Sequence, residues 1–116
     1  MVPSDDNKLS NLRRGALEYC VLALLAGPER YGLDIARELT TNGVLMSSEG
    51  TLYPLLARLR KAGWVNTSWR ESTEGPPRRY YALTTAGATA LDEFRCAWTV
   101  FRNAVDAVLV SSGGIA

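Results

Sequence analysis

Apolar residues recur in the first third of the chain at spacings that predict two helices. From Leu12 to Ala26 apolar side chains would lie on almost every side of a helix, which is typical of a helix buried at the centre of a domain. Gly27-Pro28 ends this predicted helix, because both residues favour a break. Tyr31 to Leu39 predicts a shorter amphipathic helix, which Gly43 closes.

The clearest helical pattern follows Ser47 and Ser48, either of which can cap a helix N-terminus. Its apolar stripe consists of Leu52, Leu55, Leu56 and Leu59. The residues opposite that stripe are Gly50, Thr51, Pro54, Ala57, Arg58 and Lys61. A proline inside a helix costs about 3 kcal/mol, so we expect the regular helix to begin near Leu52 after a looser turn. Gly63 stands where a helix C-terminus is expected.

The period then changes to that of a β-hairpin. In Trp64 to Glu71, β-branched and aromatic residues alternate with polar ones, which predicts a strand. Ser72 to Pro77 predicts a loop of six residues at the hairpin tip. Arg78 to Leu83 predicts a second strand, with Tyr81 and Leu83 on one face.

A last helix is predicted from a cap at Thr84 or Thr85 to about Val110. Its large apolar residues recur at the spacing of a helix–helix seam: Leu91, Phe94, Trp98, Phe101, Val105 and Val108. The seam is too short to establish a coiled coil, and it would also suit packing on the chain's own first helix alone. We favour a dimer interface, because this seam and the apolar first helix exceed what one small hairpin can cover.

The predicted order is therefore helix, helix, helix, hairpin, helix. This is a mainly α chain with a β-hairpin, of the α+β class. The second and third helices form a helix-turn-helix and the hairpin forms its wing. We expect a winged helix-turn-helix DNA-binding domain over residues 1–84 and a C-terminal dimerisation helix over residues 85–116, in one structural unit.

Composition removes most catalytic chemistry. The 116 residues suit one domain with one core, and they include no histidine and only two cysteines. Transition-metal sites need clustered His and Cys ligands, and a catalytic triad needs a histidine. We therefore expect no enzyme activity, no metal site and no cofactor. Cys20 and Cys96 lie in apolar helical sequence, so we expect buried, inert thiols.

The termini and apolar runs point to a cytoplasmic protein with no membrane partner. The longest apolar run, Tyr19 to Ala26, is far shorter than the roughly 20 residues that span a bilayer. Met1 to Asn7 is polar and partly acidic, unlike a secretory signal segment.

Positive charge is concentrated in the middle of the chain. Residues 47–84 carry six basic and three acidic side chains, a net charge of +3, whereas residues 1–46 and residues 85–116 each sum to −1. A local basic patch is what a phosphate backbone attracts. An ordinary solvated face would show the same outward arginines on a helix, but a helix-turn-helix followed by a basic hairpin is more specific. The predicted DNA contacts are Ser48, Thr51, Tyr53, Arg58, Lys61, Arg78, Arg79 and Tyr80.

Several stretches carry a more specific signal. Leu12-Arg13-Arg14-Gly15 opens a leucine-rich helix, and Tyr31-Gly32-Leu33-Asp34-Ile35 follows it. TLYPLL lies within Glu49 to Leu59, GPPRRYY within Gly75 to Thr84, and Gly87 comes soon after. From about Leu12 to its end, the chain resembles the PadR family of transcriptional regulators. The resemblance accounts for the proline within the third helix, which belongs to the family motif.

The resemblance implies a winged-helix homodimer that represses transcription by binding double-stranded operator DNA with an inverted repeat. It also implies release by a small molecule. With a single C-terminal helix, the chain resembles the short (LmrR-like) members of the family.

In short drug-binding members a tryptophan stacks flat aromatic ligands between two subunits, and Trp98 falls at that position. Neighbouring positions that are largely apolar in those members are here Asn11, Arg14, Glu18, Arg95 and Arg102. A pocket so lined buries charge at a high cost unless the charge is hydrated or paired, so it suits a small planar or anionic effector, or no ligand. The alternative is that Trp98 belongs only to the dimer core.

Three other functions compete with a DNA-binding repressor. A winged-helix protein-interaction module would be expected to lack exposed arginines on its third helix and wing. A metal sensor of similar architecture is disfavoured by the missing histidines. A thiol redox sensor would need an exposed Cys96 with a low pKa.

Overall fold

The computed structural model describes residues 3–113 of the chain, with side chains from residue 8 onward. Its helices and strands are α1 (Pro3–Arg13), α2 (Leu17–Leu24), β1 (Arg30–Tyr31), α3 (Gly32–Thr40), α4 (Leu52–Lys61), β2 (Val65–Ser72), β3 (Gly75–Leu83) and α5 (Thr85–Ser111). A one-turn 3-10 helix, Glu49–Thr51, precedes α4, as the position of Pro54 predicts. The α+β winged helix-turn-helix class predicted from the sequence is confirmed.

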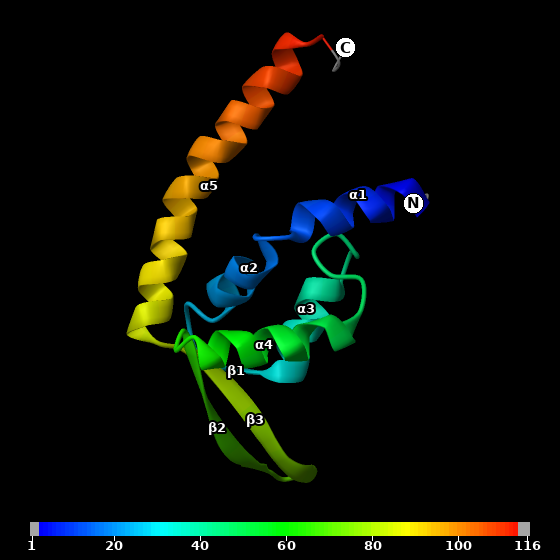
Figure 1. Cartoon of the computed structure of the whole chain (residues 1–116). Coiled ribbons are helices and arrows are strands. Elements are labelled where there is room, and N and C mark those ends of the chain that lie inside the picture. Colours follow the sequence, from blue (N-terminus) through cyan, green and yellow to red (C-terminus); the bar gives the residue numbers. More distant parts are fainter. Residues whose placement is uncertain (1–2, 114–116) are drawn as a thin grey trace.

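The core lies between α2, α3, α4 and the base of the sheet. The four leucines of the α4 stripe are buried, and the residues opposite them are exposed, as their spacing predicts. The buried residues are Val21, Leu22, Leu25, Ile35, Ala36, Leu39, Met46, Leu52, Leu55, Leu56, Leu59, Val65, Tyr81 and Leu91. This arrangement fixes α4 against α2 and α3 by one side and leaves its other side to solvent (Figure 1).

The predicted single helix from Leu12 to Ala26 is wrong. The chain forms two helices there, α1 and α2, separated by a turn over residues 14–16. Gly15 in this turn has a φ of +77°, a left-handed conformation that glycine adopts without strain. An isolated glycine is also tolerated inside a helix, so Gly15 alone did not indicate a break. The start of α1, by contrast, carries too few apolar residues to show a periodicity.

The predicted hairpin tip of six residues is also wrong. β2 extends to Ser72 and β3 begins at Gly75, so only two residues form the turn. The pairing register shifts between Arg70 and Ser72, which lets the ladder continue past an irregular step. Pro76 and Pro77 lie in β3 beyond the part paired with β1, where a missing N–H leaves no bond to that side unmade.

One strand was not predicted. β1 pairs antiparallel with β3, with Tyr31 opposite Tyr80, and gives a three-stranded sheet in the order β1-β3-β2. It takes up the start of the predicted second helix, so that α3 begins at Gly32 and reaches Thr40. Two residues are too few to show the alternation of apolar and polar side chains that marks a strand. Only their pairing with β3 defines them as one.

The predicted last helix is observed with its cap. Thr84 Oγ1 accepts a hydrogen bond from the backbone N–H of Gly87 at 3.0 Å, and α5 runs to Ser111. Figure 1 shows α5 passing α2 and continuing beyond the body, where no other described segment accompanies it. Within residues 3–113, no helix is both long and apolar enough to span a membrane.

Candidate nucleic-acid interface

Five of the eight DNA contacts predicted from the sequence lie on α4 or just before it. Tyr53, Arg58 and Lys61 are exposed on α4, Thr51 is exposed at the end of the 3-10 turn, and Ser48 is exposed just before that turn. The leucine stripe holds the helix from behind, so these side chains are presented from a fixed support. We refer to α4 as the recognition helix and to the β2–β3 hairpin as the wing.

A cleft of about 350 Å³ separates the wing from the first turns of α3 and α4. It brings together Tyr53 from the recognition helix with Arg78 and Arg79 from the wing. Tyr80 does not line this cleft. Its ring shares a face of the sheet with Arg78 and packs against Tyr31, with ring centroids 5.9 Å apart. Among the predicted contacts, the structure thus gathers two wing arginines beside the recognition helix and leaves Tyr80 apart.

Arginine side chains stack on aromatic rings along the wing. Arg79 lies 5.2 Å from the ring centroid of Trp69, Arg78 lies 4.8 Å from that of Tyr31, and Arg70 lies 4.9 Å from that of Tyr80. Arg70 also forms an ion pair with Glu29. The stacking restricts the side chains of Arg78 and Arg79 while keeping their positive charge, which lowers the entropy lost when an anion binds.

Trp69 is a candidate that the sequence interpretation missed. Its side chain lines the cleft and is 64% exposed, which is unusual for so large an apolar group. The alternating pattern identified Trp69 only as a strand residue, and the strand reaches beyond the core at this position. The signal available in the sequence was its place directly before Arg70, near the hairpin tip.

Tyr53 presents a neutral hydroxyl to the same cleft. Partial burial, and then the neighbouring Tyr31, Glu49 and Tyr81, raise the pKa of Tyr53 above the ordinary value of a phenol. The hydroxyl therefore keeps its proton at physiological pH and can donate a hydrogen bond as well as accept one.

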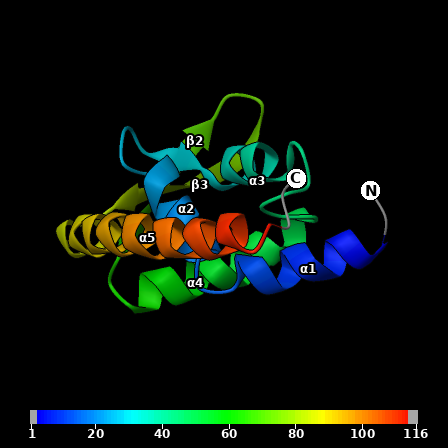
Figure 2. The same cartoon turned by 90° about the horizontal axis from the view of Figure 1, so that it is seen from above.

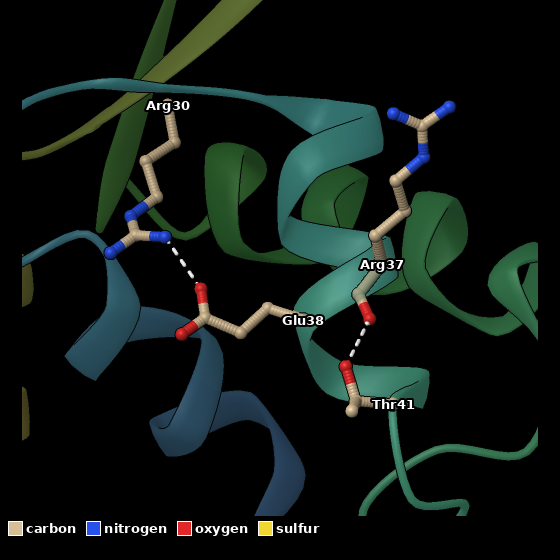
Figure 3. Close-up of polar contacts among 4 residues, drawn as sticks. All are labelled: Arg30, Arg37, Glu38 and Thr41. Atoms are coloured by element: carbon tan, nitrogen blue, oxygen red, sulfur yellow. Dashed lines mark hydrogen bonds and ion pairs between the residues drawn. The ribbon is translucent and has the colours of Figure 1, made fainter.

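The first helix of the helix-turn-helix is fixed to the sheet by an ion pair. Arg30 Nη1 of β1 lies 2.6 Å from Glu38 Oε2 of α3 (Figure 3). Thr41 Oγ1 donates a hydrogen bond to the carbonyl oxygen of Arg37 at 2.8 Å at the end of α3. The guanidinium group of Arg37 points away from both contacts in Figure 3. The end of α3 is thereby held in place before the loop that leads to the recognition helix.

A second cavity lies on the other side of the molecule, between α1, α2 and α5. It is an apolar groove of about 420 Å³, and Tyr19, Phe94 and Trp98 line it. The Tyr19 and Phe94 rings are stacked, with centroids 4.2 Å apart and planes at 3°, and Trp98 follows Phe94 at 6.0 Å and 18°. Three nearly parallel rings make a surface that fits a planar aromatic molecule.

The six residues predicted for an effector pocket do not gather within one chain. Trp98 and Arg95 line the apolar groove. Arg14 and Glu18 line a different cleft, between the α1–α2 turn and the recognition helix. Asn11 and Arg102 are exposed and line neither cavity.

The predicted α5 seam divides into a covered and an uncovered part. Leu91 is buried and Phe94 packs on Tyr19, so the start of the seam does pack on the chain's own helices. From Trp98 onward the remaining members are exposed: Trp98, Phe101, Val105 and Val108.

The two cysteines differ from the sequence-based expectation in part. Cys20 is half-buried and lines the apolar groove, and burial raises the pKa of its thiol, which disfavours the reactive thiolate. Cys96 is exposed, so the prediction of a buried thiol there is wrong for the single chain. Its side of α5 faces away from the body. Among the described residues, no cluster of three His, Cys, Asp or Glu side chains suits a metal ion.

Helices α2 and α3 packed against a leucine-lined recognition helix, with a basic hairpin beside it, define a winged helix-turn-helix transcriptional regulator. The family model of the transcriptional regulator PadR-like family matches residues 21–93. The chain therefore belongs to the PadR-like family, which confirms the family predicted from the sequence motifs.

Individual relatives support the same assignment. The transcriptional regulator Rv3488 of Mycobacterium tuberculosis is 36% identical over 87 residues, which cover 75% of this chain and 79% of the relative. A PadR-like transcriptional regulator from Bacillus cereus superimposes with a TM-score of 0.76 at 33% identity, covering 85% of this chain and 96% of the other. A PadR family regulator from Eggerthella lenta gives 0.77 at 32% identity, covering 89% of each chain. The short LmrR-like subtype stays a prediction.

Proposed function

We propose that this protein is a repressor that binds operator DNA as a homodimer and is released from it by a small-molecule effector. The observation that carries the proposal is the cleft where Tyr53 of the recognition helix meets Arg78 and Arg79 of the wing. In this mode, the exposed side of α4 enters the major groove and the wing arginines bind the neighbouring backbone. Such a partner places the protein in the bacterial cytoplasm.

The proposed DNA contacts have two roles. Thr51, Tyr53 and Ser48 can hydrogen-bond to base edges or phosphates near the start of the recognition helix. Arg58, Lys61, Arg78 and Arg79 neutralise phosphates and therefore add affinity that falls with salt. Tyr80 lies outside the cleft, where it holds Arg70 by stacking, and would act indirectly.

The exposed part of α5 supports the proposed dimer. Phe101 is 63% exposed in the single chain, and Trp98, Val105 and Val108 follow the same side of the helix. The radius of gyration is 16.6 Å, above the about 13 Å expected for a compact chain of this length, because α5 extends past the body. A second copy that packs along α5 would bury this side and give a two-fold symmetric dimer. In this proposal residues 1–84 form the DNA-binding unit and residues 85–116 the dimerisation helix.

The apolar groove supports a site for the effector. Its stacked rings would hold a planar molecule, and Arg95 at its edge would favour negative charge on that molecule. We propose that a second Trp98 from the partner closes the site. Arg14, Glu18, Asn11 and Arg102 could join it only through contacts that the dimer creates.

Electrophoretic mobility shift against the protein's own upstream intergenic DNA tests the proposal, because small repressors often regulate themselves. We expect a shift that resists competitor DNA and requires an inverted repeat, with half-site centres about 10 bp or a multiple of that apart. Arg58→Ala should abolish the specific shift while circular dichroism stays unchanged, since this side chain is exposed. Failure of the wild type to bind any duplex above non-specific affinity would favour a protein-interaction module instead.

A further inference from the structure

The cleft between the α1–α2 turn and the recognition helix is a cavity to which no function has been assigned. It has a volume of about 410 Å³, within the range of roughly 300–1,000 Å³ typical of small-molecule sites. Figure 2 shows α1 and α4 along one side of the molecule and β2 on the other, so this cleft is separate from the one beside the wing. It shares Arg13, Leu17 and Leu45 with the apolar groove as a common wall.

Positive charge dominates this cleft. Arg13, Arg14 and Arg58 line it against the single carboxylate of Glu18, a net charge of +2 among its lining side chains. Arg13 donates to two backbone carbonyls, from Nε to Val44 at 2.7 Å and from Nη2 to Gly43 at 2.5 Å. These bonds orient the guanidinium group but leave its charge unneutralised, because the acceptors are neutral.

The guanidinium groups of the other two arginines are available to bind a ligand. Within residues 8–113, the guanidinium groups of Arg14 and Arg58 have no hydrogen bond or ion pair to another side chain. Three hydroxyl groups open onto the same space, those of Ser10, Ser47 and Thr51. Unpaired guanidinium groups with hydroxyl donors between them form the donor set that binds phosphate or carboxylate oxygens in paired contacts.

We propose that this cleft binds a small phosphate-bearing or carboxylate-bearing anion, which connects the α1–α2 turn to the recognition helix and competes with operator DNA. The regulatory part rests on the proposed DNA-binding function. A bound anion would use Thr51 and Arg58, which we assign to the operator. It therefore binds better to the free protein than to the DNA complex, and this difference in affinity is what shifts the equilibrium.

Glu18 allows the effect of charge on anion binding to be tested within the cleft. Its half-buried carboxylate faces the same cavity and opposes any anion there. Removing its charge with Glu18→Gln should therefore strengthen anion binding, whereas Arg14→Gln should weaken it. Lys8→Gln is the matched control, since Lys8 is an exposed cation of α1 that does not line the cleft.

Titration calorimetry with inorganic pyrophosphate, at constant ionic strength, tests the site on the full chain. We expect one pyrophosphate bound per chain, an affinity about tenfold lower for Arg14→Gln and higher for Glu18→Gln, and no change for Lys8→Gln. Circular dichroism would establish that all three variants fold. No binding to the wild type, or the same affinity for Arg14→Gln and Lys8→Gln, overturns the proposal.

A phosphate of the operator DNA could bind in this cleft in the same way as a free anion. Fluorescence anisotropy with labelled operator distinguishes these two ligands. If a free anion is the ligand, pyrophosphate weakens operator binding by the wild type and much less by Arg14→Gln. If the Arg14→Gln variant binds operator more weakly and with a smaller salt dependence than the wild type, while pyrophosphate has no effect, then Arg14 contacts DNA. That result overturns the effector proposal. Pyrophosphate binding without any operator binding would support the anion site and refute the proposed repressor function.

Discussion

The backbone of Gly87 lies directly against the carbonyl oxygen of Trp64, so that α5 and the start of the wing touch without a side chain between them. A Cβ at Gly87 would lie inside van der Waals distance of that oxygen and 2.8 Å from Leu83 Cδ1. The same oxygen accepts a hydrogen bond from the Thr84 N–H at 3.0 Å, and Thr84 Oγ1 donates to the Gly63 carbonyl at 2.6 Å. Helix α5 is thereby attached rigidly to the wing.

Gly87→Ala should lower the stability of the protein, although alanine normally stabilises a helix interior relative to glycine. The reason is the backbone oxygen of Trp64, which cannot move without breaking the bond to Thr84. We expect a loss of about 1–3 kcal/mol in the free energy of unfolding, measured by denaturant titration. Gly75→Ala is the control, because nothing lies within 4 Å of a Cβ there. Equal stability of both variants would mean that α5 and the wing are not in contact at this point.

Arg13→Lys should loosen the loop before the recognition helix. The guanidinium group bonds the carbonyls of Gly43 and Val44 together, and a single ammonium cannot reproduce that geometry. Because the contact is partly exposed, we expect a loss of only about 1 kcal/mol, and about fivefold faster amide hydrogen exchange over residues 43–47. Arg14→Lys should leave exchange unchanged. Unaltered exchange in Arg13→Lys would show that α1 does not hold this loop.

Arg79→Ala should weaken DNA binding at all sequences to a similar extent. Arg79 lies on the wing over Trp69 and is assigned to a phosphate, so its loss should reduce the slope of log affinity against log salt by about 1. Anisotropy titrations over a range of salt concentrations measure this slope. Lys8→Ala, which removes one charge from α1, should change neither quantity. A normal slope for Arg79→Ala would remove the wing from the interface.

Phe101→Glu should dissociate the dimer. The change places a carboxylate in the middle of the exposed α5 seam, where a partner would bury it unpaired. Phe101 is 63% exposed in the single chain, so the monomer itself should still fold. Val100→Glu is the matched control, since Val100 is 72% exposed but lies off the seam. Sedimentation velocity should show a dimer for the wild type and Val100→Glu and a monomer for Phe101→Glu. A wild-type monomer at micromolar concentration would refute the proposed assembly.

Much of the fold could be predicted because apolar residues repeat at one spacing over whole helices. Such a repeat also shows which side of the helix is buried. The leucines at 52, 55, 56 and 59 form one stripe, so the sequence alone indicates which side of α4 is buried. Thr84 lies at the change from strand to helix period and caps α5 as expected. The break at Gly15 had no such signal, because an isolated glycine is also tolerated inside a helix.

The same break explains why the candidate effector residues do not gather within a single chain, and their meeting across a dimer stays a prediction. In one continuous helix, Arg14 and Glu18 would follow the side that faces α5. The turn at Gly15 redirects the chain, so that Arg14 and Glu18 line the cleft beside the recognition helix, while Trp98 remains in the apolar groove. The exposure of Trp69 likewise depends on how far the wing extends beyond the core. Distances of this kind come from tertiary packing rather than from local pattern.

The groove beside Trp98 should bind planar aromatic molecules, preferably anionic ones. Trp98 is 42% exposed and extends the stacked pair of Tyr19 and Phe94, and stacking of this kind contributes about 0.5–1.5 kcal/mol beyond area burial. Arg95 lines the same groove and should favour a negative charge. We therefore expect naphthoate to quench tryptophan fluorescence more strongly than the uncharged naphthamide.

Background quenching must be separated from this signal, because the chain has three tryptophans and Trp69 is 64% exposed on the wing. The informative quantity is the difference between the wild type and Trp98→Ala, which retains Trp64 and Trp69. A ligand that also releases operator DNA must bind better to a dimer whose recognition helices are misplaced for the operator, since equal affinity for both forms shifts nothing. Naphthoate should then lower operator affinity for the wild type and leave that of Trp98→Ala unchanged. Equal quenching of the two proteins would mean that Trp98 does not bind the ligand and belongs only to the dimer core.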